Sequence, residues 1–327
     1  MRFLLVGFFL LTAGLGLGGT WWIQQPLAMK SDPVEVTIPP GSSANGVAQN
    51  LVSAGIEVNP QWLYAWFRLS GQSRAIKAGS YEFAAGATPS GLLDKLVRGE
   101  VAMRAVTFVE GQTFRELRAA LDKAEQIRHD TQGLSDAIVM EKLGRSDMYP
   151  EGRFFPDTYL YAKGSSDLSI LQTALVAMDQ KLASVWALRS PGLTLKSPEE
   201  VLIMASIVEK ETGRASDRPL ISAVFNNRLR LGMPLQTDPT VIYGLGLRFD
   251  GNLRKRDLQA DTPWNTYTRA GLPRTPIAMP GLASLQAAVQ PAKTPALYFV
   301  ARGDGSSQFS ATLQEHNRAV NRYQLGK

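Results

Sequence analysis

Two carboxylates stand two residues apart in the stretch ASIVEKET, which runs from Ala205 to Thr212. The stretch directly follows the apolar run VLIM and contains the acids Glu209 and Glu211. Two acids this close are either catalytic, as a general acid and base, or ordinary solvated charges. The element that carries them decides between these two interpretations.

A helix start signal precedes the two glutamates. Ser197 is suited to the N-cap, Pro198 to the first helical position, and two acids fill the first turn. These residues predict a helix over 197–213, with both glutamates near its C-terminal end.

An α-helix turns about 100° per residue, which places the two acidic side chains on different faces. With Ile203 set at zero, Glu211 lies at about 80° and Glu209 at about 240°. The apolar stripe of this helix, between about 0° and 160°, comprises Val201, Ile203, Met204, Ile207 and Val208. We therefore expect Glu211 to face the interior, and Glu209 to be structural or solvent-facing.

Burial against aliphatic side chains raises the pKa of a carboxylic acid, and a raised pKa suits a general acid. The positions on this helical wheel therefore indicate Glu211 alone, and not the pair of glutamates, as the catalytic candidate. The alternative is that an inward Glu211 forms a salt bridge with a buried arginine, for example Arg228 or Arg230. Position on the helix alone leaves both hypotheses open.

The composition is that of a globular protein with one apolar segment. The chain has 327 residues, of which 44% are hydrophobic and 20% charged, enough for one large domain or two smaller ones. Its net charge of +6 comes from 35 basic and 29 acidic residues that are interspersed. No basic block alternates with aromatic residues, so we expect no nucleic-acid partner. An anionic membrane surface or an acidic envelope polymer suits the charge equally well.

Residue types exclude several kinds of metal site. The chain has no cysteine, which rules out disulfides and Cys-based zinc sites. Its 2 histidines, His129 and His316, are too few for a His-rich metal centre. We therefore expect neither a metal nor a cofactor.

The N-terminus carries an apolar run from Phe3 to Ile23, and no acidic or basic residue follows it until Lys30. A helix of about 20 apolar residues spans a bilayer core. Trp21 and Trp22 stand where an interfacial aromatic belt would fall. These features predict a single-pass anchor over residues 3–23. The alternative is a cleaved signal peptide, which usually has a shorter core and a small-residue cleavage site.

The next part of the chain repeats a strand, a turn with Gly and Ser or Thr, and a helix. The three copies span 36–56, 81–100 and 106–127. This layout resembles LysM domains, which bind glycans that contain N-acetylglucosamine, although a pure packing role is equally compatible. Residues 24–35 are predicted to be a polar linker, and residues 60–71 an aromatic amphipathic helix.

Beyond a Pro-, Gly- and aromatic-rich boundary at 147–166, the pattern favours helices. We expect them at 167–188, 197–213 and 215–231. Residues 233–327 are rich in turns and predicted short strands, and end in a helix at 310–324.

The segment from Ala205 to Gly246, which includes ASIVEKET and LQTDPTVIYG, resembles the signature of the YceG family, the MltG-type endolytic murein transglycosylases. Further matches are EGRFFPDTYLY, NTYTRAGLP and HNRAVNRY. The resemblance implies an α+β fold with three parts: a cytoplasmic tip and transmembrane anchor at 1–30, a LysM-like βα module at 31–105, and a mixed α+β catalytic domain at 106–327 built around a central catalytic helix. It also implies a single-pass protein of the inner membrane whose catalytic domain lies in the periplasm.

The activity implied by the resemblance is internal cleavage of nascent peptidoglycan strands between N-acetylmuramic acid and N-acetylglucosamine, leaving 1,6-anhydro ends and terminating elongation. The expected partners are peptidoglycan strands, peptidoglycan synthases and the lipid bilayer. The second glutamate of the E-K-E triplet, Glu211, is the implied catalytic residue. One carboxylate is enough, because the substrate's own C6 hydroxyl attacks the anomeric carbon. The candidate substrate-binding residues are Gln236, Thr237, Asp238, Tyr243, Asn227, Asn265 and Tyr267.

Two other functions stay open at this point. Asp238 is either a substrate contact, a cap of an Asx-type turn, or the second carboxylate of a hydrolytic muramidase. A non-catalytic scaffold that binds peptidoglycan through the LysM-like part would need neither Glu211 nor Asp238.

Overall fold

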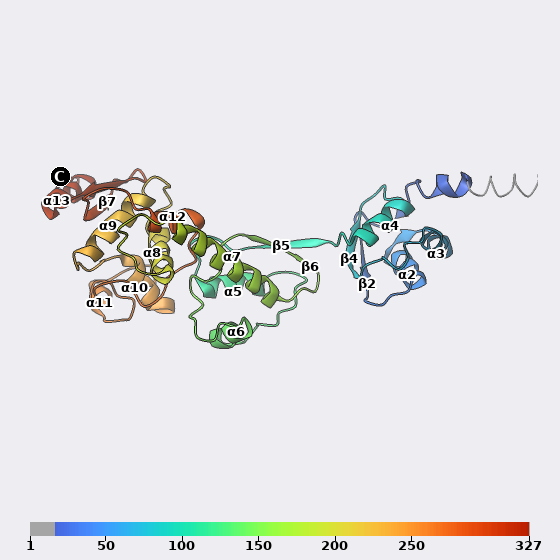
Figure 1. Cartoon of the computed structure of the whole chain (residues 1–327), viewed down its shortest axis with the longest axis horizontal. Helices are drawn as coiled ribbons and strands as arrows, with labels where there is room; N and C mark the ends of the chain where they lie inside the picture. The colour runs from blue at the N-terminus through green and yellow to red at the C-terminus, as the bar shows by residue number, and fades with distance from the viewer. Residues whose placement is uncertain (1–16, 327) are drawn as a thin grey trace, which may run out of the picture. The chain divides into compact units, whose positions relative to one another are not determined.

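The computed structural model describes residues 17–326, which fold into two compact units (Figure 1). The first unit ends at Arg104 and also contains Leu160–Ser165. The second comprises Ala105–Tyr159 and the chain from Ser166 onward. Within the described part, no helix is both long and apolar enough to cross a bilayer. Residues 3–16 of the predicted anchor lie outside the described part.

The first unit is a small α+β fold. Its elements are β1 (Ala28–Met29), β2 (Val34–Ile38), α2 (Ala44–Ala54), β3 (Ile56–Glu57), α3 (Pro60–Leu69), β4 (Gly79–Phe83) and α4 (Pro89–Arg98). Strands β2 and β4 pair antiparallel, from Val34 opposite Phe83 to Ile38 opposite Gly79. Alternate residues of β2 are buried, and strands β3 and β4 together with helices α2, α3 and α4 contribute the rest of one apolar core.

Residues 24–35 are not the linker that their polarity suggested. Strand β1 pairs with β3, and the backbone N–H of Lys30 donates to the carbonyl of Gly55 at 2.9 Å. Leu27 and Met29 pack against the core of the unit. Apolar residues spaced two apart therefore anchor this segment, even though its other residues are polar.

The three predicted strand–turn–helix repeats are present. Strand β5 (Met103–Thr107), which pairs with β6 (Thr158–Ala162), precedes α5 (Phe114–Asp122). In each repeat the hydroxyl of a Ser or Thr N-cap, Ser43, Thr88 or Thr113, accepts a backbone N–H of the helix that follows. A likeness of these repeats to LysM domains stays a prediction.

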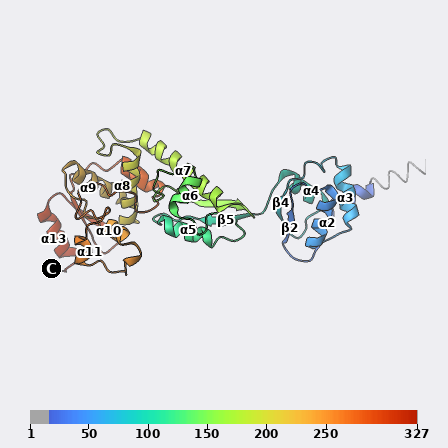
Figure 2. The same cartoon turned by 90° about the horizontal axis from the view of Figure 1, so that it is seen from below.

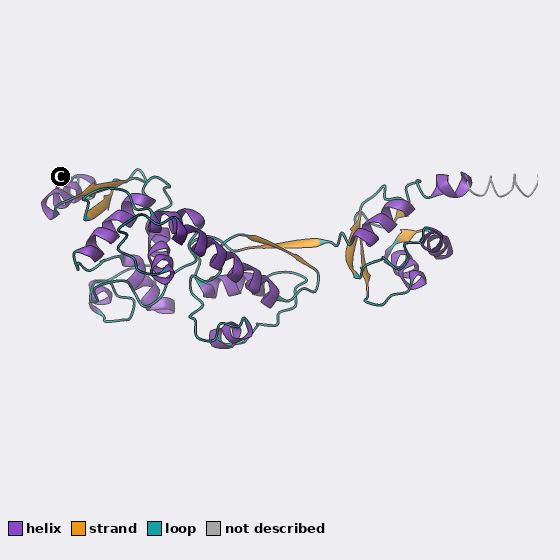
Figure 3. Ribbon diagram, viewed as in Figure 1, coloured by secondary structure: helices purple, strands orange, loops and turns teal. Residues whose placement is uncertain are grey.

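The second unit is mostly helical (Figure 3). Beyond α5 it contains α6 (Asp136–Lys142), α7 (Asp167–Ala187), α8 (Pro198–Glu211), α9 (Arg218–Arg230), α10 (Asp238–Leu245), η1 (Gly246–Arg248), α11 (Lys255–Gln259), α12 (Leu282–Val289), β7 (Tyr298–Ala301), β8 (Ser307–Ser310) and α13 (Leu313–Tyr323). The α+β class is confirmed, and so are the long helices that caps and periodicity predicted.

Helix α8 forms the centre of this unit (Figures 1 and 2). It packs against α7, α9, α10 and α12. Every residue from Val201 to Val208 is buried, including Leu202, which the wheel placed off the apolar stripe. The prediction of an amphipathic helix is therefore wrong. A helix that is apolar on every side is buried in the core of a protein.

The prediction for residues 233–327 was incomplete. Helices α10, α11 and α12 lie in a region expected to hold turns and short strands. They have 8, 5 and 8 residues, too few turns for a clear helical period. The paired strands β7 and β8 and the terminal helix α13 are confirmed.

Candidate active site

Glu211 is the last residue of α8, where the chain leaves the helix in an extended conformation at Thr212. Glu211 is partly exposed, whereas Val201–Val208 earlier in the same helix are buried. The hydroxyl of Thr237 donates a hydrogen bond to Oε1 of Glu211. The structure thus brings together two residues that the sequence singled out.

Thr237 occupies the N-cap of α10, yet its side chain makes no capping bond. A Thr at this position ordinarily accepts a backbone N–H of the first turn. Here the hydroxyl serves Glu211 instead. The segment is therefore a helix N-terminus, and not the rigid polar loop or Asx-type turn considered from the sequence.

The residue before Thr237 has an unusual backbone. Gln236 has φ of 50°, in the left-handed region that side chains other than glycine rarely adopt. Its N–H donates to the carbonyl of Thr266 at 3.1 Å, which holds this conformation in place. Its side chain is exposed beside the site, at 3.5 Å from Nη1 of Arg228.

Two buried threonines, Thr240 and Thr266, form hydrogen bonds with the backbone of Thr237. The backbone N–H of Thr237 donates to the hydroxyl of Thr266 at 3.1 Å. The Thr266 hydroxyl lies 2.9 Å from that of Thr240, which donates to the Thr237 carbonyl at 2.7 Å. Together these bonds form a clamp, named here the threonine clamp, of Thr237, Thr240 and Thr266. Thr266 was not a candidate from the sequence.

Asp238 and Tyr267 form a second pair next to Glu211. The phenol of Tyr267 donates to Oδ1 of Asp238 at 2.6 Å. Burial raises the pKa of Tyr267 above its ordinary range, and the Asp238 and Glu211 carboxylates raise it further. Tyr267 therefore stays protonated and serves as a donor.

The pKa of Glu211 is raised to about 7, chiefly by burial and further by the negative charge of Asp238, against the opposing effect of the Thr237 hydrogen bond. The position of Glu211 at a helix C-terminus also disfavours its charged form. The alternative of a salt bridge finds no support. Arg228 donates to the carbonyls of Leu235 and Leu297, and Arg230 donates to Asn227.

Glu209 has a structural role, which is one of the two roles expected from the helical wheel. Its side chain is buried and not solvent-facing. Its Oε2 accepts the backbone N–H of Gly281 at 2.9 Å, and its Oε1 lies 3.6 Å from Arg218. The two glutamates of ASIVEKET therefore do not act as a pair.

A second buried carboxyl group belongs to Glu151, which was not among the site residues predicted from the sequence. Its Oε1 accepts the backbone N–H of Phe114 at 3.0 Å, and its Oε2 accepts the phenol of Tyr243, also at 3.0 Å. Burial raises the pKa of Glu151 to about 7. Tyr243, a predicted substrate ligand, thus uses its hydroxyl to tie α10 to the start of α5.

The two asparagines among the predicted ligands hold backbone segments. The amide of Asn227 donates to the carbonyls of Thr294 and Ala296, both at 2.9 Å. That of Asn265 donates to the carbonyls of Ala260 and Leu258, and its oxygen accepts the N–H of Tyr267. Both side chains are buried, and the structure does not bring either of them to Glu211.

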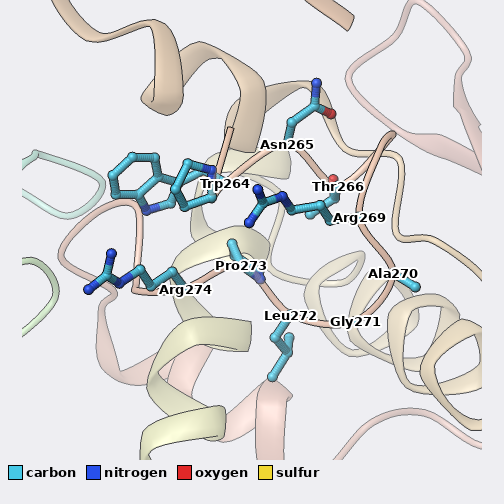
Figure 4. Close-up of a pocket in the computed structure, with 10 residues that line it drawn as sticks. Trp264, Asn265, Thr266, Arg269, Ala270, Gly271, Leu272, Pro273 and Arg274 are labelled. Carbon is cyan, nitrogen blue, oxygen red and sulfur yellow. The ribbon is translucent and has the colours of Figure 1, made fainter. Parts of the chain in front are cut away.

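A cavity of about 370 Å³ opens along residues 263–274, the loop that carries Thr266 (Figure 4). Its volume falls within the range of small-ligand sites. Trp264 is one of the lining residues and donates its indole N–H to the Thr275 hydroxyl at 2.9 Å. Within residues 17–326, no group of three His, Asp or Glu side chains is placed to bind a metal ion.

Comparison with known proteins adds to this geometry. The model of the YceG-like family matches residues 36–322. An endolytic murein transglycosylase of Bacillus subtilis is 31% identical over 89% of this chain and 84% of its own length. One of Streptococcus pneumoniae is 28% identical over 96% of this chain, which spans only 64% of that relative.

A crystal structure shows a similar fold. A YceG-like protein of Listeria monocytogenes superimposes with a TM-score of 0.54 at 29% identity, covering 88% of this chain and 98% of the other. Both kinds of comparison agree with the resemblance carried by ASIVEKET and LQTDPTVIYG. The chain belongs to the YceG-like family.

Proposed function

We propose that this protein is an endolytic murein transglycosylase, which cleaves the bond between N-acetylmuramic acid and N-acetylglucosamine inside peptidoglycan strands. One observation carries the proposal: the partly exposed Glu211 has a pKa raised to about 7 and accepts a hydrogen bond from the Thr237 hydroxyl. The names of the relatives in Bacillus and Streptococcus support the same activity.

Near neutral pH, a carboxyl group of this pKa can both donate and accept a proton. Protonated Glu211 gives its proton to the glycosidic oxygen as the bond to the anomeric carbon of the muramyl sugar breaks. The C6 hydroxyl of the same sugar attacks that carbon and forms the 1,6-anhydro bond. The Glu211 carboxylate accepts the proton of this hydroxyl, so that the enzyme returns to its starting state.

The residues around Glu211 would contact the sugars. Gln236 and the Asp238–Tyr267 pair present polar groups next to the carboxyl group. We assign them to hydroxyl and N-acetyl groups of the strand. We assign Asn227, Asn265 and Tyr243 to support of the site, because their polar groups are engaged with protein partners.

A murein-cleaving enzyme acts in the cell envelope. We propose that residues 3–23 anchor the chain in the inner membrane and that the rest lies in the periplasm, near the peptidoglycan synthases that supply nascent strands. The strand–turn–helix repeats would then add glycan contacts of the LysM kind. Support for this arrangement comes from the length and the flanking tryptophans of the apolar run.

A hydrolytic muramidase is the second candidate, because Asp238 lies close enough to Glu211 to influence its pKa. In that mechanism Asp238 would activate a water molecule or attack the sugar. Hydrolysis gives a reducing end that is heavier by one water than the anhydro product, so the two reactions differ in product mass.

The test is to incubate the full-length chain with sacculi and to analyse the released muropeptides by mass spectrometry. We expect anhydro products from the wild type. Glu211→Gln should lower the rate by about 10²- to 10⁴-fold, because it removes the proton donor. Glu141→Gln, an exposed change on α6, is the matched control and should keep full activity. Retained cleavage by Glu211→Gln would transfer the acid role elsewhere, and reducing ends would favour the muramidase.

A further inference from the structure

Large apolar side chains are exposed at the end of the first unit where the apolar N-terminal segment enters it. Leu17 and Trp21, in the helical residues 17–22, are 73% and 67% exposed. Trp62 and Leu69 of α3 are 58% and 85% exposed. These residues belong to two helical segments that meet through the contact of Trp22 with Trp62, and large apolar groups exposed near one another mark an interaction surface. These four residues are named here the tryptophan face.

The members on α3 share one stripe of that helix. At about 100° per residue, Leu69 lies about 20° from Trp62, and Ala65 lies between them along the helix at about 60°. Trp22 packs edge-to-face against Trp62, with ring centroids 5.8 Å apart and planes at 89°. Residues 17–22 and α3 therefore lie side by side (Figures 1 and 2).

The entry point of the apolar segment is fixed to the unit. Trp22 packs against the core. The carbonyl of Ile23 accepts the N–H of Ser90 at 3.0 Å, and the N–H of Leu27 donates to the carbonyl of Ala87 at 2.9 Å. No flexible tether intervenes between Trp22 and the fold. Whatever surface receives Leu17 and Trp21 is therefore brought close to Trp62.

We propose that the tryptophan face seats on the lipid–water interface of the bilayer, so that the first unit is oriented on the membrane and not suspended from it. This inference rests on the proposed anchor over residues 3–23. Tryptophan and leucine suit this occupant, because indole rings partition to the headgroup level and leucine to the acyl boundary. Arg68, exposed beside Leu69 in the sequence of α3, adds a positive charge to this helix, which suits anionic headgroups.

The experiment uses single-cysteine spin labels in the full-length chain, reconstituted in vesicles of phosphatidylethanolamine and phosphatidylglycerol. Because the chain has no native cysteine, each label reports one position. Ala65→Cys places the label within the α3 stripe and leaves Trp62 and Leu69 intact. Thr37→Cys is the control, on the exposed face of β2, which lies at the opposite end of the unit from residues 17–22 (Figure 1).

The measurement compares collisions of each label with oxygen, which concentrates in lipid, and with a water-soluble nickel chelate. We expect the oxygen-to-nickel ratio at position 65 to be several-fold higher than at position 37. Trp62→Ser combined with Leu69→Ser should abolish most of this difference. Leu160→Ser, a change at another exposed leucine of the same unit, should leave it unchanged.

Equal ratios at the two positions, in protein that resists alkaline extraction from the vesicles, would overturn the seating and leave the anchor standing. Dipolar broadening between labels at position 65 without lipid contact would assign the face to a second copy, and would also overturn it. Release of the protein by alkali would refute the anchor, and the seating with it.

Discussion

At the scale of single residues, the pKa of Glu211 is set by neighbours that act in opposite directions. The Thr237 hydroxyl stabilises the carboxylate, while the charge of Asp238 destabilises it. The general acid must be protonated in free enzyme, so the alkaline limb of kcat/KM reports this pKa. Substitutions at the two neighbours should therefore move the limb in opposite directions.

Thr237→Val removes the hydrogen bond and keeps the size of the side chain. The pKa of Glu211 should rise, so the alkaline limb should move to higher pH by about half a unit to one unit. The measurement is kcat/KM for strand cleavage as a function of pH. Thr237→Ser is the control and should restore the wild-type limb, because it retains the hydroxyl. An unchanged limb in Thr237→Val would remove Thr237 from this role.

Asp238→Asn removes the charge and keeps the acceptor for Tyr267. The pKa of Glu211 should fall, so the alkaline limb should move to lower pH while the product stays an anhydro sugar. The same pH series and product masses check this expectation. Loss of all activity in Asp238→Asn would instead favour Asp238 as the second carboxylate of a muramidase.

At the scale of elements, the threonine clamp determines where α10 begins and thus where Thr237 points. Thr266→Val leaves the N–H of Thr237 without its acceptor, which should cost about 1–3 kcal/mol of unfolding free energy. It should also lower kcat more than it raises KM, because the misplaced hydroxyl no longer supports Glu211.

Denaturant unfolding and steady-state kinetics check the clamp together. Thr266→Ser keeps the hydroxyl and should rescue both quantities. Thr268→Val changes an exposed threonine of the same loop and should have little effect on either. A stability loss without any change in kcat would reduce the clamp to a purely structural feature.

Local signals explain which elements the sequence could predict. Helices α7, α8 and α9 are long. A serine N-cap marks the start of α7 and of α8, and a proline in the first turn marks the start of α8 and of α9. Helix α10 has the same kind of signals, with Thr237 at the N-cap and proline in the first turn, but only 8 residues and a polar beginning. Its sequence therefore looked like a loop.

The site residues also divide into those that local sequence signals could predict and those that depend on partners distant in the sequence. The wheel selected Glu211 on the assumption of a half-buried helix, whereas α8 is buried on every side and Glu211 is distinguished by its position at the helix end beside Thr237. Glu151 and Thr266 escaped notice because their partners are distant in sequence. Nothing in the residues next to Glu151 distinguishes a buried glutamate from a solvated one.

At the scale of the whole molecule, Glu151 and Glu211 link the stability of the second unit to pH. Burial raises the pKa of each to about 7, above the ordinary 4.5. Between about pH 4.5 and about pH 7, the native state with its raised pKa values therefore binds more protons than the unfolded chain. The stability that protonation provides is fully present below about pH 4.5 and is lost as the pH rises through about 7.

Glu151→Gln tests this linkage without touching the proposed acid. A neutral amide can accept the N–H of Phe114 and donate to the Tyr243 oxygen, so the contacts can persist while the charge cannot form. Near pH 8 the variant should be more stable than wild type by about 1–3 kcal/mol, and near pH 5 the difference should largely vanish. The measurement is thermal unfolding across this pH range. Glu141→Gln, at an exposed position, is the control, and its difference in stability from wild type should not change with pH. A variant that is destabilised equally at both ends would mean that Glu151 serves the fold as a hydrogen-bond acceptor alone.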